Sequence, residues 1–459
     1  MPLLLTTLAV ALLTVFCCTI VPHLRRLHTI LHFIKTKQLP LYPGTLYAEH
    51  NSFTIPFPIP GKAGLLTAEP ECIKTMMSSE FKNVGVSLGR APYTPLLGAG
   101  LFIQDGARWS HPRSLLRPLF TRSAVSSFAL LESLLQPLFA HVLAAQKSGE
   151  AIDLEPLFQT LTLDLTTAFL LGEPAGEKGK EFADALEEGM KHVNFSLQLG
   201  RFWWVWRPRG FTAAIRQVEG FVEHYLRRNS SGAFVKTLLD AGESEQQVRA
   251  HVLNTLFAGR DSTAATLSWV VWNLVRRRDI AARVRAEIAD VVGDALPTVQ
   301  ALAEMKFFRA VLNETLRLHP PVPLTNREPL GPTVILPGKA PIRLKQGEPV
   351  YLDFFTLHRR QDLWGDDAAA FRPERWGENE QFEREMTARW CFLPFGLGGR
   401  SCLGQQLAIN TVMYTIVRLS QKVGGLERVV KTQEDGDQVR FTNSPVPAPG
   451  EGVWVALKE

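Results

Sequence analysis

The stretch Phe395-Gly-Leu-Gly-Gly-Arg-Ser-Cys-Leu-Gly404 holds a single cysteine, Cys402, in a glycine-rich loop with Arg400 two residues before it. A thiolate presented by such a loop can bind haem iron, and a sulfur ligand donates electron density to the iron and favours cleavage of a bound O–O bond. A histidine ligand would instead favour oxygen carriage or peroxidase chemistry. The loop therefore indicates an oxygenase, and the simpler alternative is an inert buried cysteine in a turn.

The residues around Cys402 are suited to binding haem through the cysteine. Gly398 and Gly404 let the backbone approach the plane of a porphyrin, and Phe395 can shield the sulfur from water. Apolar residues recur at helical intervals over 403–419, which predicts that the cysteine lies at a helix N-terminus. Backbone N–H groups and the helix dipole at that end lower the pKa of a thiol.

The composition indicates one large domain in a reducing compartment. The chain has 459 residues, 46% of them hydrophobic, and neither a linker nor an internal repeat divides it. Its five cysteines are too few and too irregularly spaced for a disulfide framework. The net charge of +5 suits a membrane surface or an acidic partner, and no nucleic-acid-binding module is recognisable. The basic and aromatic run 201–209 would suit base stacking, but membrane contact or packing is favoured beside an apolar N-terminus.

The N-terminus predicts a membrane anchor. Residues 2–21 are uncharged and mostly apolar, about long enough to cross a bilayer core, and they lack the features of a cleaved signal. We therefore expect residues 1–22 to be a single-pass transmembrane signal anchor. Basic residues follow in His23-Leu-Arg-Arg26, and positive charge stays cytosolic. We expect residues 23–44 to form an interfacial basic helix with a proline hinge, and residues 45–459 to form a cytosolic catalytic domain.

A long helix is predicted over 244–278, because the stretch has no proline and Gly259 is its one internal breaker. Gly259 would leave room for O2, and Ser262 could distort the helix by bonding to a carbonyl one turn back. Asp261 and Ser262 then form a candidate catalytic proton relay. The alternative is that both are solvated helix residues.

Two further groups of residues have expected roles around such a site. Glu314 and Arg317 share a helix face, and Arg375 downstream could complete a buried structural cluster. Trp109 and Arg113 lie one helical turn apart and could reach the same carboxylate. Haem has two propionates, and Arg113, Arg327 and Arg400 would form a cationic cage for them. The alternative for each arginine is an ordinary surface position.

Taken together, residues 109–113, 258–263, 314–317, 371–376 and 395–404 resemble, in order, the motifs of the cytochrome P450 superfamily of haem-thiolate monooxygenases. The resemblance implies a mostly helical fold with a small β-sheet region behind the transmembrane helix. It also implies Cys402 as the axial ligand of haem b, NADPH-cytochrome P450 reductase as electron donor, and the endoplasmic reticulum membrane as location. Ala258 stands where some animal fatty-acid hydroxylases have a haem-linking glutamate, so haem should be bound non-covalently.

Longer stretches at 95–98, 105–109, 116–120, 313–323 and 402–406 are similar to fungal alkane and fatty-acid hydroxylases. This similarity implies a long aliphatic substrate, although an apolar lining also suits a polyketide or a terpenoid. The expected lining residues are Leu97, Leu101, Phe102, Leu256, Phe257, Val322 and Leu324. Ser262 stands where the family most often has threonine, which keeps the hydroxyl group. A shorter region around 225–237 favours a secondary-metabolite pathway over primary lipid metabolism.

Two other classes of function remain open from the sequence. An oxygen-independent haem-thiolate isomerase or dehydratase would have little use for Asp261 and Ser262. A non-catalytic haem-binding membrane protein would need neither these residues nor an apolar pocket. Product formation that depends on NADPH and O2 separates the three classes.

Overall fold

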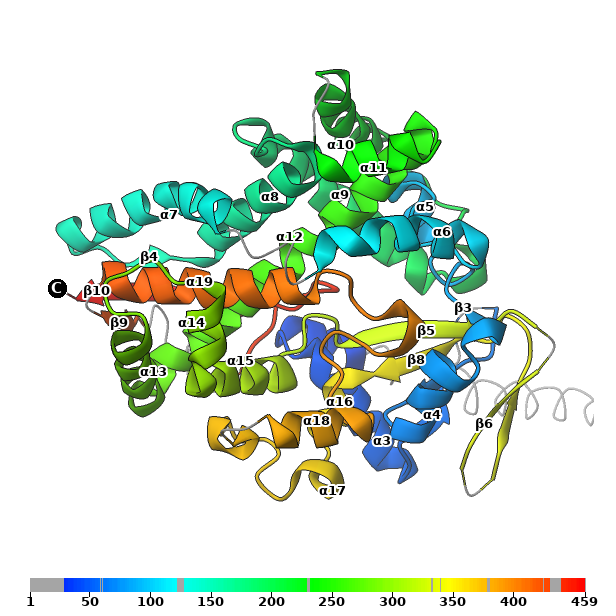
Figure 1. Ribbon diagram of the computed structural model, residues 1–459. Helices are drawn as coiled ribbons and strands as arrows, with labels where there is room; N and C mark the ends of the chain where they lie inside the picture. Colours follow the sequence, from blue (N-terminus) through cyan, green and yellow to red (C-terminus); the bar gives the residue numbers. More distant parts are fainter. Residues whose placement is uncertain are drawn as a thin grey trace, which may run out of the picture.

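The computed structural model describes residues 29–458, apart from 58, 60, 122–127, 229–231, 332, 339, 378–379, 424 and 430–438. Within these residues the chain is mostly helical, and its short strands form three small sheets. Figure 1 shows the helices filling the upper and left parts of the molecule, with the largest sheet at the lower right. The expectation of a helix-rich fold with a small sheet region is confirmed.

The longest helix, α12, runs through the centre of the fold. It covers Glu245–Arg276, and Ser244 caps it by accepting a hydrogen bond from the backbone N–H of Gln247, whose side chain bonds back to Ser244. This reciprocal pair satisfies two N–H groups that a helix start otherwise leaves unpaired. Helix α12 is contacted by α8, α15 and α19, and its apolar residues are buried on several sides. The predicted helix over 244–278 is therefore present, and it ends where Arg277 leaves helical geometry.

Most of the other helices of eight or more residues lie around α12, while α3 and α18 lie at the bottom of the view in Figure 1. The helices of this length besides α12 are α3 (Tyr42–His50), α6 (Ala107–Leu116), α7 (Ala129–Ser148), α8 (Glu155–Leu171), α9 (Lys178–Gln198), α10 (Arg209–Arg227), α11 (Ala233–Asp240), α13 (Arg278–Val291), α15 (Lys306–Leu318), α18 (Gln381–Ala388) and α19 (Gln405–Lys422). The shorter ones are α4 (Pro70–Lys74), α5 (Thr94–Leu97), α14 (Val299–Glu304), α16 (Phe354–Leu357) and α17 (Gln361–Trp364). One apolar cluster joins α7, α8, α12, α15 and α19, and a second joins α5, α9, α10 and α11 to the first half of α12.

The largest sheet has five strands in the order β1-β2-β8-β5-β3. These strands are β1 (Thr54–Pro56), β2 (Leu65–Thr67), β8 (Val350–Asp353), β5 (Leu324–Pro329) and β3 (Val84–Gly85). The pair β2 and β8 is parallel, and the other pairs are antiparallel. A third apolar cluster lies between this sheet and helices α3 and α4.

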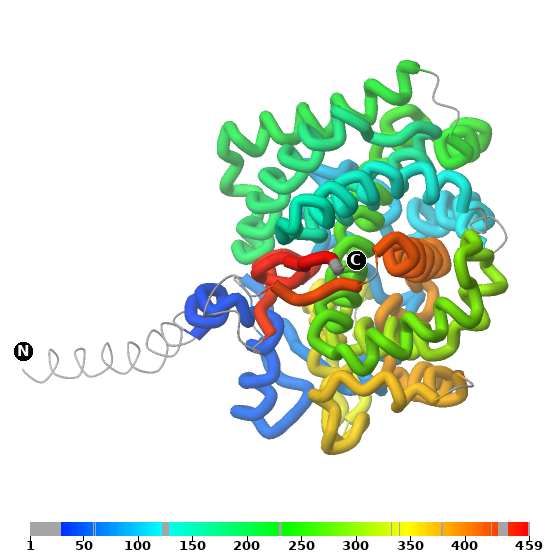
Figure 2. The backbone as a smooth tube through the Cα atoms, turned by 90° about the vertical axis from the view of Figure 1, so that its left-hand side faces the viewer, coloured from blue at the N-terminus to red at the C-terminus, as the bar shows by residue number. Residues whose placement is uncertain are grey.

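Two smaller sheets complete the fold. One contains β4 (Ile152–Asp153), β10 (Trp454–Lys458) and β9 (Gly425–Arg428) in that order, and the other pairs β6 (Val334–Leu336) with β7 (Ile342–Leu344). Strand β10 contacts α7, and Figure 2 shows the C-terminal segment running beside that helix. The end of the chain is thereby attached to the main helical core.

The predicted anchor, residues 1–22, lies outside the described residues. Among residues 29–458 as described, no helix is both long and apolar enough to cross a membrane. Residues 29–35 are helical, but the proline hinge expected before residue 45 is instead a 3-10 turn, Leu39–Leu41, that leads straight into α3. A proline is tolerated in the first turn of a helix because its missing N–H has no partner there. Tyr42 and Leu46 of α3 are buried, so the folded domain begins before residue 45.

Candidate haem-binding site

The cysteine loop folds back on itself just before α19. The N–H of Cys402 donates a hydrogen bond to the carbonyl of Phe395, 2.9 Å away, and α19 starts at Gln405, so the cysteine lies at a helix N-terminus as expected. Gly398 has a φ of +74°, and a Cβ there would collide with the carbonyl oxygen of Met77. Only glycine fits this position without strain.

Gly404 differs from the expectation. Its φ is −84°, which any residue can adopt, and a Cβ there would lie 4.0 Å from the sulfur of Cys402. Glycine therefore keeps side-chain atoms away from the sulfur and is not needed for the turn. The ring of Phe395 packs against the main apolar cluster, so this residue supports the loop with both its ring and its carbonyl.

Cys402 keeps exposed surface, although its thiol is surrounded by protein groups. Burial raises its pKa above the usual value for cysteine, while the N–H of Gly404 and the charge of Arg113 lower it. The expectation that the helix end would lower the pKa is therefore wrong for the free thiol, because the loss of hydration outweighs the helix contribution. A metal ion deprotonates a coordinating thiol directly, so this shift does not oppose ligation.

Two arginines flank the ring of Trp109 beside the cysteine loop. The guanidinium carbon of Arg400 lies 4.5 Å from the ring centre and that of Arg113 lies 5.4 Å from it. Arg113 donates to the carbonyl of Ser401, 2.7 Å away, and so ties α6 to the residue before the cysteine. Arg400 forms an ion pair with Asp105. The structure thus brings Trp109, Arg113 and Arg400 together.

Arg327 extends this group and a fourth arginine, Arg90, joins it. Burial and the charges of Arg90 and Arg400 lower the pKa of Arg327 to about 9. Burial, followed by the charge of Arg400, lowers the pKa of Arg90 to about 10. Sequence reasoning missed Arg90, since it belongs to no recognisable motif and reaches the group only through the folding of the chain.

The charges of this arginine group test whether haem fits. Arg90, Arg327 and Arg400 all interact with the carboxylate of Asp105, and Arg90 interacts with Glu328 as well. Arg113 interacts with Cys402 and Arg117 and with neither carboxylate, so positive charge is in excess in this group. Both carboxylates already accept backbone N–H bonds, Asp105 from Val86 and Ser87. Buried charge is costly unless an opposite charge compensates it. Two propionate groups would supply that compensation, so the donor set fits haem bound through Cys402.

Helix α12 supplies the candidate proton relay. The hydroxyl of Ser262 donates to the carbonyl of Ala258, 2.7 Å away and one turn back, as expected. Burial raises the pKa of Asp261, and the neighbouring Arg260 opposes this through an ion pair of 3.1 Å. Ser262 is half-buried and Ala258 is exposed, in a stretch of helix whose neighbours are mostly buried. Ala258 and Ser262 are therefore not packed into the core at this point of α12.

The expected role of Gly259 is wrong. A Cβ on this residue would meet the side chain of Thr166 in α8 at 3.0 Å, so Gly259 permits close packing of two helices and makes no room for O2. Thr162 of α8 also donates to the carbonyl of Arg260, 2.9 Å away. The exposed surface next to the relay belongs to Ala258 instead.

The residues expected to line an apolar site differ in how deeply they are buried. Leu97 and Leu256 have no exposed surface and belong to the core, which corrects their assignment. The others keep exposed surface: Leu101, Phe102 and Phe257 are half-buried, and Val322 and Leu324 are exposed. Apolar spacing along a helix does not distinguish a residue that lines a cavity from one that fills the core.

The cluster expected from Glu314, Arg317 and Arg375 is formed in full. Glu314 is completely buried and accepts two bonds from Arg317, of 2.8 and 2.9 Å, and one of 2.9 Å from Arg375. Trp376 and the N–H of Arg372 complete its partners. Arg317 also donates to the carbonyls of His358 and Ala368. The cluster joins α15 to the segment that precedes the cysteine loop.

The match to a protein-family model agrees with this geometry. The model described as Cytochrome P450 matches residues 65–422, which include every site residue discussed above. The chain belongs to the cytochrome P450 family. Haem ligation by a cysteine thiolate is a property of the family, and the arginine group and the Cys402 loop of this P450 fit it.

Curated relatives of this P450 are fungal enzymes. Cytochrome P450 monooxygenase fsdH of Fusarium heterosporum is 34% identical over 80% of this chain and 70% of its own length. Cytochrome P450 52A1 of Candida tropicalis is 34% identical over 83% of this chain and 76% of its own. Cytochrome P450 monooxygenase himC of Aspergillus japonicus is 35% identical over 80% and 70%. The protein is therefore a cytochrome P450 monooxygenase.

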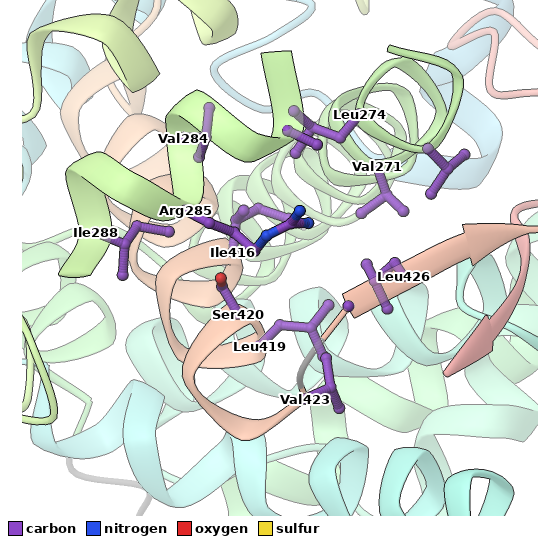
Figure 3. Close-up of a pocket in the computed structure, with 13 residues that line it drawn as sticks. Val271, Leu274, Val284, Arg285, Ile288, Ile416, Leu419, Ser420, Val423 and Leu426 are labelled. Carbon is purple, nitrogen blue, oxygen red and sulfur yellow. The ribbon is translucent and has the colours of Figure 1, made fainter. Parts of the chain in front are cut away.

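A separate cavity of this P450 lacks residues that could bind haem. It lies between α12, α13, α19 and β9, has a volume of about 50 Å³, and is shown in Figure 3. Its walls are aliphatic, and Arg285 and Ser420 are the lining residues with polar side chains. Neither residue is a ligand for haem iron, and Cys402 is not among the lining residues.

Proposed function

We propose that this P450 hydroxylates a small apolar substrate, an aliphatic chain or the hydrocarbon part of a polyketide or terpenoid, with electrons from NADPH-cytochrome P450 reductase. The observation that carries the proposal is that Cys402 keeps exposed surface beside a group of arginines whose positive charge exceeds that of the carboxylates around it. A pathway of secondary metabolism is the setting we favour. Haem, when bound, supplies the activation of O2 and the transfer of one oxygen atom to a C–H bond.

The residues of the chain have separate tasks in this reaction. Cys402 holds the iron, and Trp109 with Arg90, Arg113, Arg327 and Arg400 holds the propionates. The apolar side chains of Leu101, Phe102, Phe257, Val322 and Leu324 exclude water and bind the hydrocarbon, because burial of apolar surface is favourable.

Asp261 and Ser262 supply the protons that the reduction of O2 requires. The raised pKa of Asp261 brings its carboxyl closer to the pH range in which it can both take up and release a proton. The hydroxyl of Ser262 donates its hydrogen to the carbonyl of Ala258. Its oxygen still has lone pairs, and these can accept a proton that Asp261 supplies. Rotation of that hydroxyl passes its own hydrogen onward.

Stoichiometry tests this function. The wild-type enzyme with reductase should consume NADPH, O2 and substrate in step, and Ser262→Ala should divert NADPH oxidation to hydrogen peroxide. Thr266→Val is a matched control, because Thr266 lies one turn further along α12 and its hydroxyl bonds only to the carbonyl of Ser262. Product formation without O2 would favour an isomerase or dehydratase, and haem binding without turnover would favour a non-catalytic protein. Tight coupling in the Ser262 variant would refute the relay.

We further propose that residues 1–22 anchor the chain in the endoplasmic reticulum membrane, that the loop between α9 and α10 contacts the same membrane, and that the catalytic domain lies in the cytosol. Phe202, Trp204, Val205 and Trp206 are all exposed, at 52, 60, 62 and 42%. Exposed arginines flank them at 201, 207 and 209. Aromatic rings beside basic residues are typical of segments that insert at the headgroup level.

Vesicle binding tests this surface. A chain that begins at residue 29 should float with vesicles that contain anionic lipid, and Trp204→Asp with Trp206→Asp should release it. Leu296→Asp is the control, because Leu296 is 56% exposed on a different part of the fold. Equal release by both changes would contradict a specific membrane contact.

A further inference from the structure

Two buried polar side chains of α12 hold the segment 97–102, which leads from α5 toward α6. His251 is 3% exposed and Asn254 is 2% exposed, and they lie three residues apart on one face of the helix. Helix α5 packs against this part of α12 (Figure 1). A buried polar group is costly unless it is hydrogen-bonded, so the partners of these two residues indicate what they do.

All the recorded partners of the two side chains are backbone groups, and most belong to the segment. The N–H of Leu101 donates to Nδ1 of His251 at 3.1 Å, and the N–H of Phe102 donates to Oδ1 of Asn254 at 2.8 Å. Nδ2 of Asn254 donates to the carbonyl of Leu97 at 2.9 Å and to that of Ala250 at 2.8 Å. Burial lowers the pKa of His251 to about 4, so the ring is neutral and accepts at Nδ1 near pH 7.

Two glycines let the segment lie directly on the helix. A Cβ on Gly98 would lie 2.8 Å from the Cβ of Ala250. A Cβ on Gly100 would lie 2.5 Å from the carbonyl oxygen of Ala250 and 2.7 Å from the side-chain amide of Asn254. Real side chains essentially never come so close, so the hydrogen bonds to His251 and Asn254 depend on glycine at these positions.

The segment includes Leu101 and Phe102, two residues of the apolar lining proposed above. Phe102 is half-buried, and the centre of its ring lies 5.6 Å from the centre of the Phe257 ring. Phe257 directly precedes the exposed Ala258. Arg90 stacks 3.8 Å from the centre of the Phe102 ring and donates to the carbonyl of Phe102 at 2.6 Å. Phe102 is thus fixed through its N–H, its carbonyl and its ring, between α12 and the arginine group.

We propose that His251 and Asn254 are positioning residues that fix the segment 97–102 on α12 and thereby determine how an apolar chain lies against Leu101 and Phe102. The proposal rests on the hydroxylase function proposed above. It predicts that loss of these bonds alters the binding of a hydrocarbon chain while the iron and its immediate surroundings stay as they are.

Two probes separate the hydrocarbon wall from the iron. Imidazole binds the iron alone, whereas 1-dodecylimidazole also places an alkyl chain in the apolar lining, and each binding event shifts the haem absorption. Asn254→Ala and His251→Leu should raise the Kd of 1-dodecylimidazole about tenfold, a factor equivalent to 1.4 kcal/mol, with the Kd of imidazole unchanged. His251→Gln keeps an acceptor and should lie closer to wild type.

Matched variants control for damage to the helix. Thr255→Val removes a hydroxyl from the next position of α12 that bonds only to the carbonyl of His251, so it should change neither Kd. Gly100→Ala leaves both positioning residues in place but forces the segment away, and it should behave like Asn254→Ala. Equal weakening of both probes, or no change in either, would overturn the proposal.

Hydrogen exchange gives a readout that is independent of the reaction. The amides of Leu101 and Phe102 should exchange faster in Asn254→Ala and in His251→Leu than in Thr255→Val. Equal exchange rates would refute the proposal that His251 and Asn254 hold the segment 97–102 on α12. If wild-type protein binds no haem, the proposed function fails, and the exchange rates still decide whether His251 and Asn254 hold the segment.

Discussion

Replacement of Glu314 by glutamine should destabilise this P450 severely without touching its haem. Glu314 has no exposed surface and accepts bonds from Arg317, Arg375, Trp376 and the backbone of Arg372. Glutamine keeps the shape, but it removes the negative charge and turns one acceptor into a donor that faces other donors. Arg317 then lies buried without its ion-pair partner, and Arg375 keeps only its pair with Asp367, which costs about 3–5 kcal/mol.

That loss is large against the stability of an ordinary domain, about 5–15 kcal/mol. Urea unfolding followed by circular dichroism measures it. With an m-value of about 3 kcal/mol per M, the midpoint should fall by about 1–2 M urea. The position of the cluster, between α15 and the segment before the cysteine loop, predicts that haem binding and unfolding are lost at the same urea concentration.

Glu374→Gln is the matched control. Glu374 precedes Arg375 in the same 3-10 turn, Pro373–Trp376, and pairs with Arg283 on the surface, where the two side chains are 45% and 54% exposed. Exposed pairs contribute about 0–1 kcal/mol because water solvates and screens both charges. If Glu314→Gln lowers the midpoint no more than Glu374→Gln does, the assignment of a buried, interdependent charge cluster is refuted.

Three further outcomes follow from the geometry. Arg327→Ala should release haem to apomyoglobin about tenfold faster, since a charge-assisted hydrogen bond contributes about 1.5–3 kcal/mol, and an unchanged release rate would contradict its contact with a propionate. The free energy of unfolding should fall as the pH drops from about 6.5 toward 4, because His251 is neutral in the fold and takes up a proton when unfolded; urea titrations should show a shallower fall in His251→Gln. Overpacking of Gly259→Ala against Thr166 should offset the roughly 0.5–1 kcal/mol that alanine gains over glycine inside a helix, and the added change Thr166→Ala should restore that gain in thermal melts.

Much of the candidate site could be predicted from local sequence motifs. Glu314 and Arg317 are one helical turn apart, so their pairing follows from helix geometry alone. Ser262 reaches back to Ala258 by the same periodicity, and Cys402 precedes α19 because apolar spacing marks where that helix runs. Each of these features depends on neighbours within a few residues.

Features that depend on distant segments could not be predicted in this way. Arg90 is more than two hundred residues from Arg327, and His251 meets Leu101 across 150 positions of the chain. The pKa of Cys402 depends on burial, which no local pattern reports. Leu97 and Leu256 have the same apolar character as true lining residues, and only packing distinguishes them.

The absorption spectrum of the reduced, carbon monoxide-bound protein tests most directly whether Cys402 is the thiolate ligand of haem. Wild-type protein should show the strongly red-shifted Soret band of a thiolate-ligated haem, and Cys402→His should show the band of a histidine-ligated one. Cys391→Ser is the control, because Cys391 is buried in the core away from the arginine group. A red-shifted band that survives in Cys402→His, or that disappears in Cys391→Ser, would contradict the assignment.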